Sequence, residues 1–259
     1  MRFYPDALGC TGAFALFSAN IYSTRAVWYV NSVTGVDAGT TPSNLESPFA
    51  SLPYAVTVCG NGDFIVLAAE HDETLVNVVD IPPGVILIGA GGTSTMPEAT
   101  LRVGEGGGIT TNYFGMIANI YFAESLCTVP WAWGMGPDVR YINCYFECGA
   151  WDTGAVMYWQ DDPTYAGYVV NCTFKATSAG CNVAMLSENR DRFVHMTNVT
   201  FDGGTVGFVG PAFLNQTTSI TMLHGWNISL LNGADMVIMA ESSGFVHVTT
   251  ATGGARVDW

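Results

Sequence analysis

The chain has 259 residues, of which 12% are charged, against about 25% in an ordinary soluble domain. Its 8 basic and 22 acidic residues give a formal net charge of −14, and Lys175 is the single lysine. Nucleic acids and acidic polysaccharides are disfavoured as partners, because binding them requires clustered Lys and Arg. No apolar run approaches the roughly 18 residues of a membrane-spanning helix, so we expect no membrane association of that kind.

The composition favours an all-β fold with reduced cysteines. Glycine (30 residues) and proline (11) accompany many β-branched and aromatic residues, a mixture typical of short strands joined by turns. The seven cysteines are odd in number and form no Cys-x-x-Cys pair. We therefore expect mostly buried thiols, with neither a disulfide framework nor a zinc site.

Residues 1–27 lack any strand pattern. Their mixture of Phe, Leu, Tyr and Gly with few charges predicts an N-terminal arm that becomes ordered against a partner. Pro5 and Asp6 interrupt what would be the basic region of a signal peptide, so we expect a protein made in the cytoplasm.

The segment 28–104 predicts several strands and one short helix. Residues 28–40 have the pattern of a strand followed by a Gly/Asp turn. Residues 47–58 offer a capping serine, a proline at the first helical position and apolar residues at helical spacing. Residues 62–68 and 84–91 predict two further strands, each beginning at a glycine.

An internal repeat organises the rest of the chain. Five tetrapeptides share the pattern of Asn, a small or medium apolar residue, a hydroxyl residue and a large apolar residue. They start at Asn119, Asn143, Asn171, Asn198 and Asn227, with spacings of 24, 28, 27 and 29 residues. The intervals contain short strand-like runs at 155–159, 168–171, 182–186, 193–196, 206–209, 219–223 and 236–239. A repeat of this length with several strands per copy predicts the coils of a parallel β-helix.

Alternation along a strand assigns a direction to each repeat position. The second and fourth positions are predicted to point inward: Ile120 and Phe122, Cys144 and Phe146, Cys172 and Phe174, Val199 and Phe201, Ile228 and Leu230. The third position is predicted to point outward: Tyr121, Tyr145, Thr173, Thr200 and Ser229. Two interpretations of the asparagines remain open: a hydrogen-bonded side-chain ladder, or tolerance of an unusual turn conformation.

We therefore expect an all-β protein built as a single right-handed parallel β-helix over residues 28–259, with the opening strands and helix cap at 28–104 and the coils at 105–259. About eight coils at about 4.8 Å each would give a length of about 40 Å. The short helix is expected to cover the open N-terminal end, where core and strand edges would otherwise meet water.

The order of strand, short helix, Gly-Asp strand and Gly84-Val-Ile-Leu-Ile-Gly89 resembles the start of pectate-lyase-like β-helix proteins, especially those that phages encode and carry in their virions. The resemblance implies the fold; together with the chain length it leads to the hypothesis of a virion structural protein, foremost a capsid decoration or cement protein, with a tail or adaptor protein as the variant. Such a protein would bind other virion proteins such as the major capsid protein, and we expect no cofactor. The apolar excess predicts a homotrimer, in which each copy covers one face of its neighbours.

The alternative function is a carbohydrate-binding or glycoside-hydrolysing β-helix of the tailspike type. A lyase would need a convergent basic centre, but Lys175 stands alone within the repeat, and Arg140, Arg190 and Arg192 are scattered between coils. A hydrolase would need paired carboxylates, for which the candidates are Asp161 and Asp162, with His224 as an accompanying residue. The four histidines fall in different intervals without an i, i+4 pair, so the sequence predicts no metal site.

Aromatic residues supply the candidate contacts for assembly, although each fits the core equally well. They are Tyr121, Tyr145, Trp131, Trp133 and Trp259.

Overall fold

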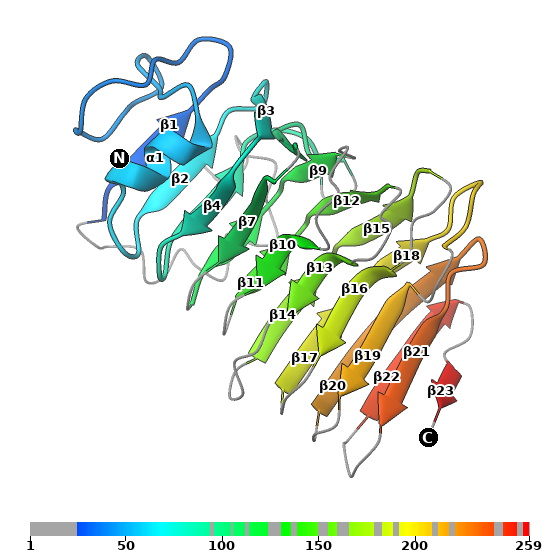
Figure 1. Ribbon diagram of the computed structural model, residues 1–259. Coiled ribbons are helices and arrows are strands. Elements are labelled where there is room, and N and C mark those ends of the chain that lie inside the picture. The colour runs from blue at the N-terminus through cyan, green and yellow to red at the C-terminus, as the bar shows by residue number, and fades with distance from the viewer. Residues whose placement is uncertain are drawn as a thin grey trace.

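The computed structural model describes residues 25–93, 96–104, 106–111, 114–123, 131–135, 139–149, 155–159, 166–178, 183–188, 192–208, 212–217, 221–240, 246–252 and 256–258. Within these residues the chain forms one helix and strands β1 to β23, which lie on three faces of a long prism (Figure 1).

The first face contains β1 (Val27–Val30), β2 (Phe64–Leu67), β5 (Ile86–Gly89), β8 (Met116–Ala118), β11 (Arg140–Ile142), β14 (Ala166–Val170), β17 (Arg192–Thr197), the start of β20 (Thr221–Leu231) and β22 (Val246–Thr252). The second face contains β3 (Asp72–Leu75), β6 (Thr100–Val103), β9 (Tyr121–Ala123), β12 (Tyr145–Cys148), β15 (Thr173–Ala176), β18 (Thr200–Asp202) and the end of β20. The third face contains β4 (Val78–Ile81), β7 (Gly108–Thr111), β10 (Trp131–Met135), β13 (Ala155–Trp159), β16 (Val183–Glu188), β19 (Phe213–Thr217), β21 (Met236–Ala240) and β23 (Arg256–Asp258).

From β2 onward consecutive strands belong to different faces, and each strand pairs in parallel with the strand one winding later. The third face is an eight-stranded sheet that receives one strand from each winding. The predicted right-handed parallel β-helix is confirmed, since a parallel crossover of this kind is right-handed in nearly all proteins. Figure 1 shows the windings progressing from the N-terminal β1 and β2 to the C-terminal β22 and β23.

Most predicted elements are present, with three local differences. The run at 206–209 does not form a strand in its described part, because residues 204–206 make a turn and the Val206 side chain is exposed. The helix, α1 (Leu52–Val58), begins later than residue 47, because Ser51 is its N-cap and Pro53 lies in its first turn. Residue 27, the last of the predicted arm, is the first residue of β1 and pairs with Phe64.

Helix α1 covers the N-terminal end of the core. The Ser51 hydroxyl accepts a hydrogen bond from the Tyr54 backbone N–H, which satisfies one of the free donors at the helix start. Leu52 and Ala55 are fully buried in the same cluster that runs through the windings. The apolar face of the helix therefore closes the open end of the solenoid, as the sequence predicts.

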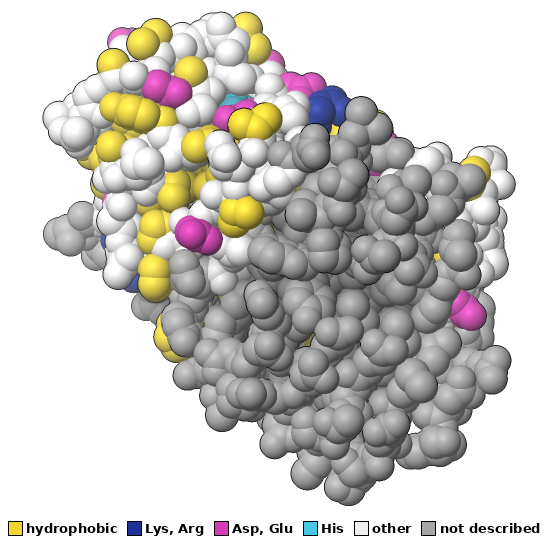
Figure 2. Space-filling model, viewed as in Figure 1, with side chains coloured by type: hydrophobic (Ala, Val, Ile, Leu, Met, Phe, Trp, Pro, Cys, Tyr) yellow, Lys and Arg dark blue, Asp and Glu magenta, His cyan; other side chains and the backbone are white. Residues whose placement is uncertain are grey.

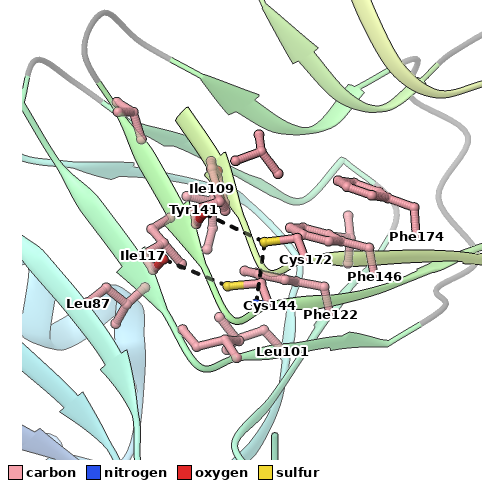
Figure 3. Close-up of a cluster of buried hydrophobic side chains, with 14 of the residues drawn as sticks. Leu87, Leu101, Ile109, Ile117, Phe122, Tyr141, Cys144, Phe146, Cys172 and Phe174 are labelled. Atoms are coloured by element: carbon pink, nitrogen blue, oxygen red, sulfur yellow. Dashed lines mark hydrogen bonds between the residues drawn. The ribbon is translucent and has the colours of Figure 1, made fainter. Parts of the chain in front are cut away.

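A stack of phenylalanine rings forms the centre of the core. Phe122, Phe146, Phe174 and Phe201 occupy one inward row on the second face and are each at most 1% exposed. The Phe122 and Phe146 ring centroids are 4.6 Å apart, as are those of Phe146 and Phe174, and the rings are nearly parallel. Figure 3 shows the rings of Phe122, Phe146 and Phe174 beside Cys144 and Cys172, which point into the same interior.

The inward directions predicted for the repeat are confirmed for all five copies. The four cysteines in the described part of the chain, Cys59, Cys144, Cys148 and Cys172, are not disulfide-bonded. The other three predicted thiols, Cys10, Cys127 and Cys181, lie outside the described residues. No described helix is long and apolar enough to cross a membrane.

The five repeat asparagines make the corner between the first and second faces, and both interpretations of them hold. Each has a positive φ between 52° and 56°, the left-handed region that asparagine tolerates better than most residues. Side-chain amides also bond from winding to winding: Asn171 donates to Asn143 at 3.1 Å, Asn198 to Asn171 at 2.8 Å, and Asn227 to Asn198 at 2.8 Å. Asn119 instead donates to the Gly89 and Gly91 carbonyls, so the ladder begins at Asn143.

Candidate functional sites on the outer faces

The outer side of the second face carries an aromatic and acidic cluster. Tyr121 on β9 and Tyr145 on β12 are in register, and their rings meet edge to face with centroids 5.5 Å apart. The Tyr121 hydroxyl donates a hydrogen bond to the Glu147 carboxylate. Both tyrosines are half-buried, and this desolvation, with Glu147 nearby, raises the pKa of each phenol. The phenols are therefore neutral donors at physiological pH.

Charged side chains extend this cluster in both directions along the face. Towards the N-terminus, Arg102 makes two hydrogen bonds of 2.9 Å to Asp72, which is the geometry of a bidentate ion pair. This arginine lowers the pKa of the Asp72 carboxyl. Towards the C-terminus, Glu147, Lys175 and Asp202 are in register on three successive windings, so their charges alternate.

Aromatic rings beside carboxylates and cations suit the binding of a sugar, whose apolar face stacks on a ring while its hydroxyls bond to charged groups. Glu147 and Asp202 are two strands apart, or about 10 Å at about 4.8 Å per strand. Retaining glycosidases need about 5–5.5 Å between carboxyl groups and inverting enzymes about 6.5–9.5 Å. Asp202 also accepts bonds from Asn232 at 2.6 Å and the Gly204 N–H at 2.8 Å. The separation lies outside the retaining range and at the upper limit of the inverting range, and because Asp202 is already engaged by these two donors, the cluster fits binding better than hydrolysis.

A row of side chains on the outer side of the first face changes character along the prism. It lies three residues before each corner asparagine, and we call it the outer row: Met116, Arg140, Tyr168, His195 and His224, which are in register on β8, β11, β14, β17 and β20. Towards the N-terminus it continues in Phe64 and Ile86, which form a small buried cluster with Met116.

Ring contacts connect the polar part of the outer row. The Arg140 guanidinium lies over the Tyr168 ring at 5.2 Å, a cation–π contact. Tyr168 stacks on His195 with centroids 5.0 Å apart and an interplanar angle of 7°. His195 and His224 follow at 5.6 Å and 60°. Partial burial, with His224 as a second contribution, lowers the pKa of His195, so this imidazole is neutral at physiological pH.

This row is not apparent from histidines at helical spacing, the pattern by which the sequence predicts no metal site. The signal is the coil period: His195 and His224 are 29 residues apart, as are Asn198 and Asn227. Residues at equal distances from the corner asparagines must occupy the same row on successive windings.

A buried histidine at the N-terminal cap has a structural role. The His71 ring is fully buried; its Nδ1 accepts the Ser32 backbone N–H at 3.0 Å, which leaves the proton on Nε2. That nitrogen lies 3.1 Å from the Glu73 carboxylate, which also accepts the Leu52 N–H at the start of α1. His71 and Glu73 therefore hold the capping helix to the second face.

Large apolar side chains are exposed on the N-terminal windings. Val33, Val36 and Leu45, between β1 and α1, are 69%, 68% and 72% exposed. Met96 and Phe114, in the connections after β5 and β7, are 67% and 66% exposed. In the coloured part of Figure 2, hydrophobic side chains gather over this end of the molecule.

The Phe114 backbone has a φ of 60°, a conformation that is unfavourable for a bulky side chain.

The predicted site residues have different outcomes. Tyr121 and Tyr145 lie on the outer face as expected, and His224 is exposed on β20 beside His195. Trp131 and Trp133 belong to β10, but their side chains lie outside what the structure describes. Asp161, Asp162 and Trp259 also lie outside the described residues, so the carboxylate pair and the terminal contact stay predictions.

No protein-family model and no curated protein matches the chain. The crystal structure of Escherichia coli YbhC is similar to it, with a TM-score of 0.49 and 9% sequence identity over 86% of this chain and 72% of that chain. The class follows from the strand register of the chain itself: it is a parallel β-helix protein with one short capping helix.

Proposed function

We propose that the chain is a structural protein of a phage virion, a capsid decoration protein that binds the major capsid protein through its N-terminal windings. The observation that supports this function is the set of exposed apolar side chains at that end, Val33, Val36, Leu45, Met96 and Phe114. Exposed apolar surface that is concentrated on one part of a protein is typical of a protein–protein contact. A tail or adaptor protein would use the same end in the same way.

Phe114 is the residue on which the proposed capsid contact depends most. A glycine or asparagine at position 114 would adopt this left-handed backbone conformation at lower cost. The position nevertheless holds phenylalanine, whose side chain is mostly exposed. Strain of this kind is maintained where function requires it. We assign Phe114 the role of an anchor that inserts into the capsid protein, since buried aromatic anchors carry much of the energy of an interface.

The test is co-sedimentation of the purified chain with undecorated capsids of the virus. Phe114→Gly should abolish binding while leaving the chain folded and as stable as before, because it relieves the backbone strain. Val206→Ser is the matched control, since Val206 is an exposed apolar residue in a turn far along the prism. Equal binding by Phe114→Gly and the parent chain would contradict the proposal.

The decoration protein is further proposed to be a homotrimer of laterally packed prisms that assembles on the virion after synthesis in the host cytoplasm. A three-fold arrangement would cover one long face of each copy. Sedimentation equilibrium or mass photometry of the full chain should give three times the 27.6 kDa monomer mass. A monomer at all concentrations, together with no capsid binding, would overturn both the assembly and the proposed function.

A second candidate function, binding of a surface glycan, is favoured by the Tyr121, Tyr145 and Glu147 cluster. Tyr145→Ala should remove binding on a glycan array, whereas Tyr145→Phe should keep most of it, because the ring supplies the stacking surface. Release of reducing sugar that disappears in Asp161→Ala would instead support the hydrolase. Absence of any glycan signal from the full chain would exclude this candidate.

A further inference from the structure

The two imidazoles at the C-terminal part of the outer row lie side by side on adjacent parallel strands. His195 on β17 and His224 on β20 are in register, and the next residue of the row in register on β22 is again a histidine, His247. His195 is half-buried and His224 is exposed, so an ion from solvent can reach the pair. Three histidines at consecutive positions of one row contrast with Met116, Arg140 and Tyr168 before them.

We propose that His195 and His224 bind a divalent transition-metal ion, with Zn²⁺, Ni²⁺ and Cu²⁺ as the chemical class. Imidazole nitrogen is a preferred ligand of these metals, whereas Mg²⁺ and Ca²⁺ prefer oxygen. In this site the ion bridges two windings across the strand pair. Its remaining coordination positions hold water, which leaves the ion open to an additional ligand.

The spacing of the rings fits such an ion. In a tetrahedral site with metal–nitrogen bonds of about 2.0–2.1 Å, two ligating imidazole rings have their centroids about 5 Å apart. The observed separation of His195 and His224 is 5.6 Å, and the 60° between their planes allows both rings to direct a nitrogen at a common point. The parallel stack of Tyr168 on His195, at 7°, does not have this geometry and instead fixes the His195 ring.

The described side chains of the outer row do not oppose a cation strongly. Arg140 is the charged side chain of the same row on the described strands, and it lies two strands from His195, with the Tyr168 ring between them. Two strands correspond to about 10 Å, close to one Debye length at 0.1 M salt, so salt screens part of its repulsion. Among the described residues no group of three or more His, Cys, Asp and Glu is arranged to hold a metal, so the described site is a two-histidine site.

The experiment is calorimetric titration of the untagged full chain with Zn²⁺, and separately with Ni²⁺. We expect one ion per chain, with binding at least tenfold weaker in His195→Gln and in His224→Gln. Thr197→Ala is the matched control, because Thr197 is the next outward residue on β17 and is paired with Trp226. This control should bind like the parent chain, and circular dichroism should show the same fold for all variants.

A second measurement separates this surface site from metal bound elsewhere. Trp226 lies two residues after His224 and is 55% exposed, so Cu²⁺ at the site should quench part of the tryptophan fluorescence of the parent chain. The quenching should disappear in His224→Gln and persist in Thr197→Ala. Absence of Zn²⁺ binding by the parent chain, or unchanged affinity and quenching in His224→Gln, would overturn the proposal.

Discussion

Two rows of side chains that lie a few residues apart on the same windings differ in how far one residue type repeats from winding to winding. The inner row holds Phe122, Phe146, Phe174 and Phe201 on four consecutive windings. On these four windings the outer row of the neighbouring face holds four different residues, Met116, Arg140, Tyr168 and His195. The following winding adds His224. Stacking identical rings fills the interior without voids, so packing enforces repetition inside, whereas the part of the outer row from Arg140 onward meets solvent, which imposes no such demand.

This contrast indicates where function is to be sought in a solenoid. A repeated inner residue is explained by the core, and its repetition carries no functional information. A repeated outer residue has no such explanation, because each winding could hold any polar side chain there. Histidine on successive positions of the outer row is therefore the more informative repetition, although the inner one is the more conspicuous in the sequence.

The largest effect is expected from breaking the inner row. Phe146 is fully buried between two rings at 4.6 Å, so Phe146→Ala should lower the free energy of unfolding by about 3–5 kcal/mol. Its neighbour Tyr145 points outward, and Tyr145→Ala should cost about 1 kcal/mol or less. Urea unfolding followed by circular dichroism measures both, and similar losses for the two would contradict the assignment of faces.

The next largest loss of stability is expected at the asparagine corner between the first and second faces. Asn171→Ala removes the amide from the ladder and places a Cβ residue in the left-handed region, for an expected loss of about 2 kcal/mol. Asn171→Gly removes the amide, but glycine adopts the left-handed backbone conformation without strain. Its free energy of unfolding should therefore fall by about half as much. Urea midpoints of the two variants separate the ladder from the turn. Equal losses in both would mean that the backbone conformation contributes nothing.

A smaller, pH-dependent effect is expected from the interior thiols. Complete burial raises the pKa of Cys144 well above its value of about 8.5 in an unfolded chain. The contribution of the neutral Cys144 thiol to stability is fully present below pH 8.5. It is lost as the pH rises from there towards the folded-state pKa, because in this range the thiol ionises only in the unfolded chain. The loss is about 1.4 kcal/mol per pH unit. Urea midpoints between pH 8 and pH 10.5 should therefore fall, and less steeply in Cys144→Ala.

The sequence was sufficient for the periodic part of the fold. The repeat at Asn119 and its four successors predicted the corner, the inward rows and the β-helix, because a coil period leaves the same residue type at the same position of each winding. It was insufficient for the cap, where α1 begins at Leu52 and His71 and Glu73 hold it through contacts between separate elements. The outer row was visible in the spacing, but only once distances were counted from the corner asparagines.

The smallest effect concerns the charged end of the second face, which contrasts with the buried rows. Arg102 and Asp72 form a bidentate pair, but their side chains are 40% and 55% exposed, so Arg102→Ala should cost only about 0.2–1 kcal/mol at neutral pH. The arginine lowers the pKa of Asp72, so the contribution of the pair is present above the unfolded-chain pKa of about 3.9. It is lost as the pH falls through the lower folded-state value, and 1 M salt should weaken it. Urea unfolding of Arg102→Ala and the parent chain at pH 7 and pH 2.5 measures this: the difference in the free energy of unfolding should be small at pH 7 and smaller still at pH 2.5. A difference that grows on acidification would mean that Arg102 stabilises the fold through the packing of its alkyl chain and not through the carboxylate.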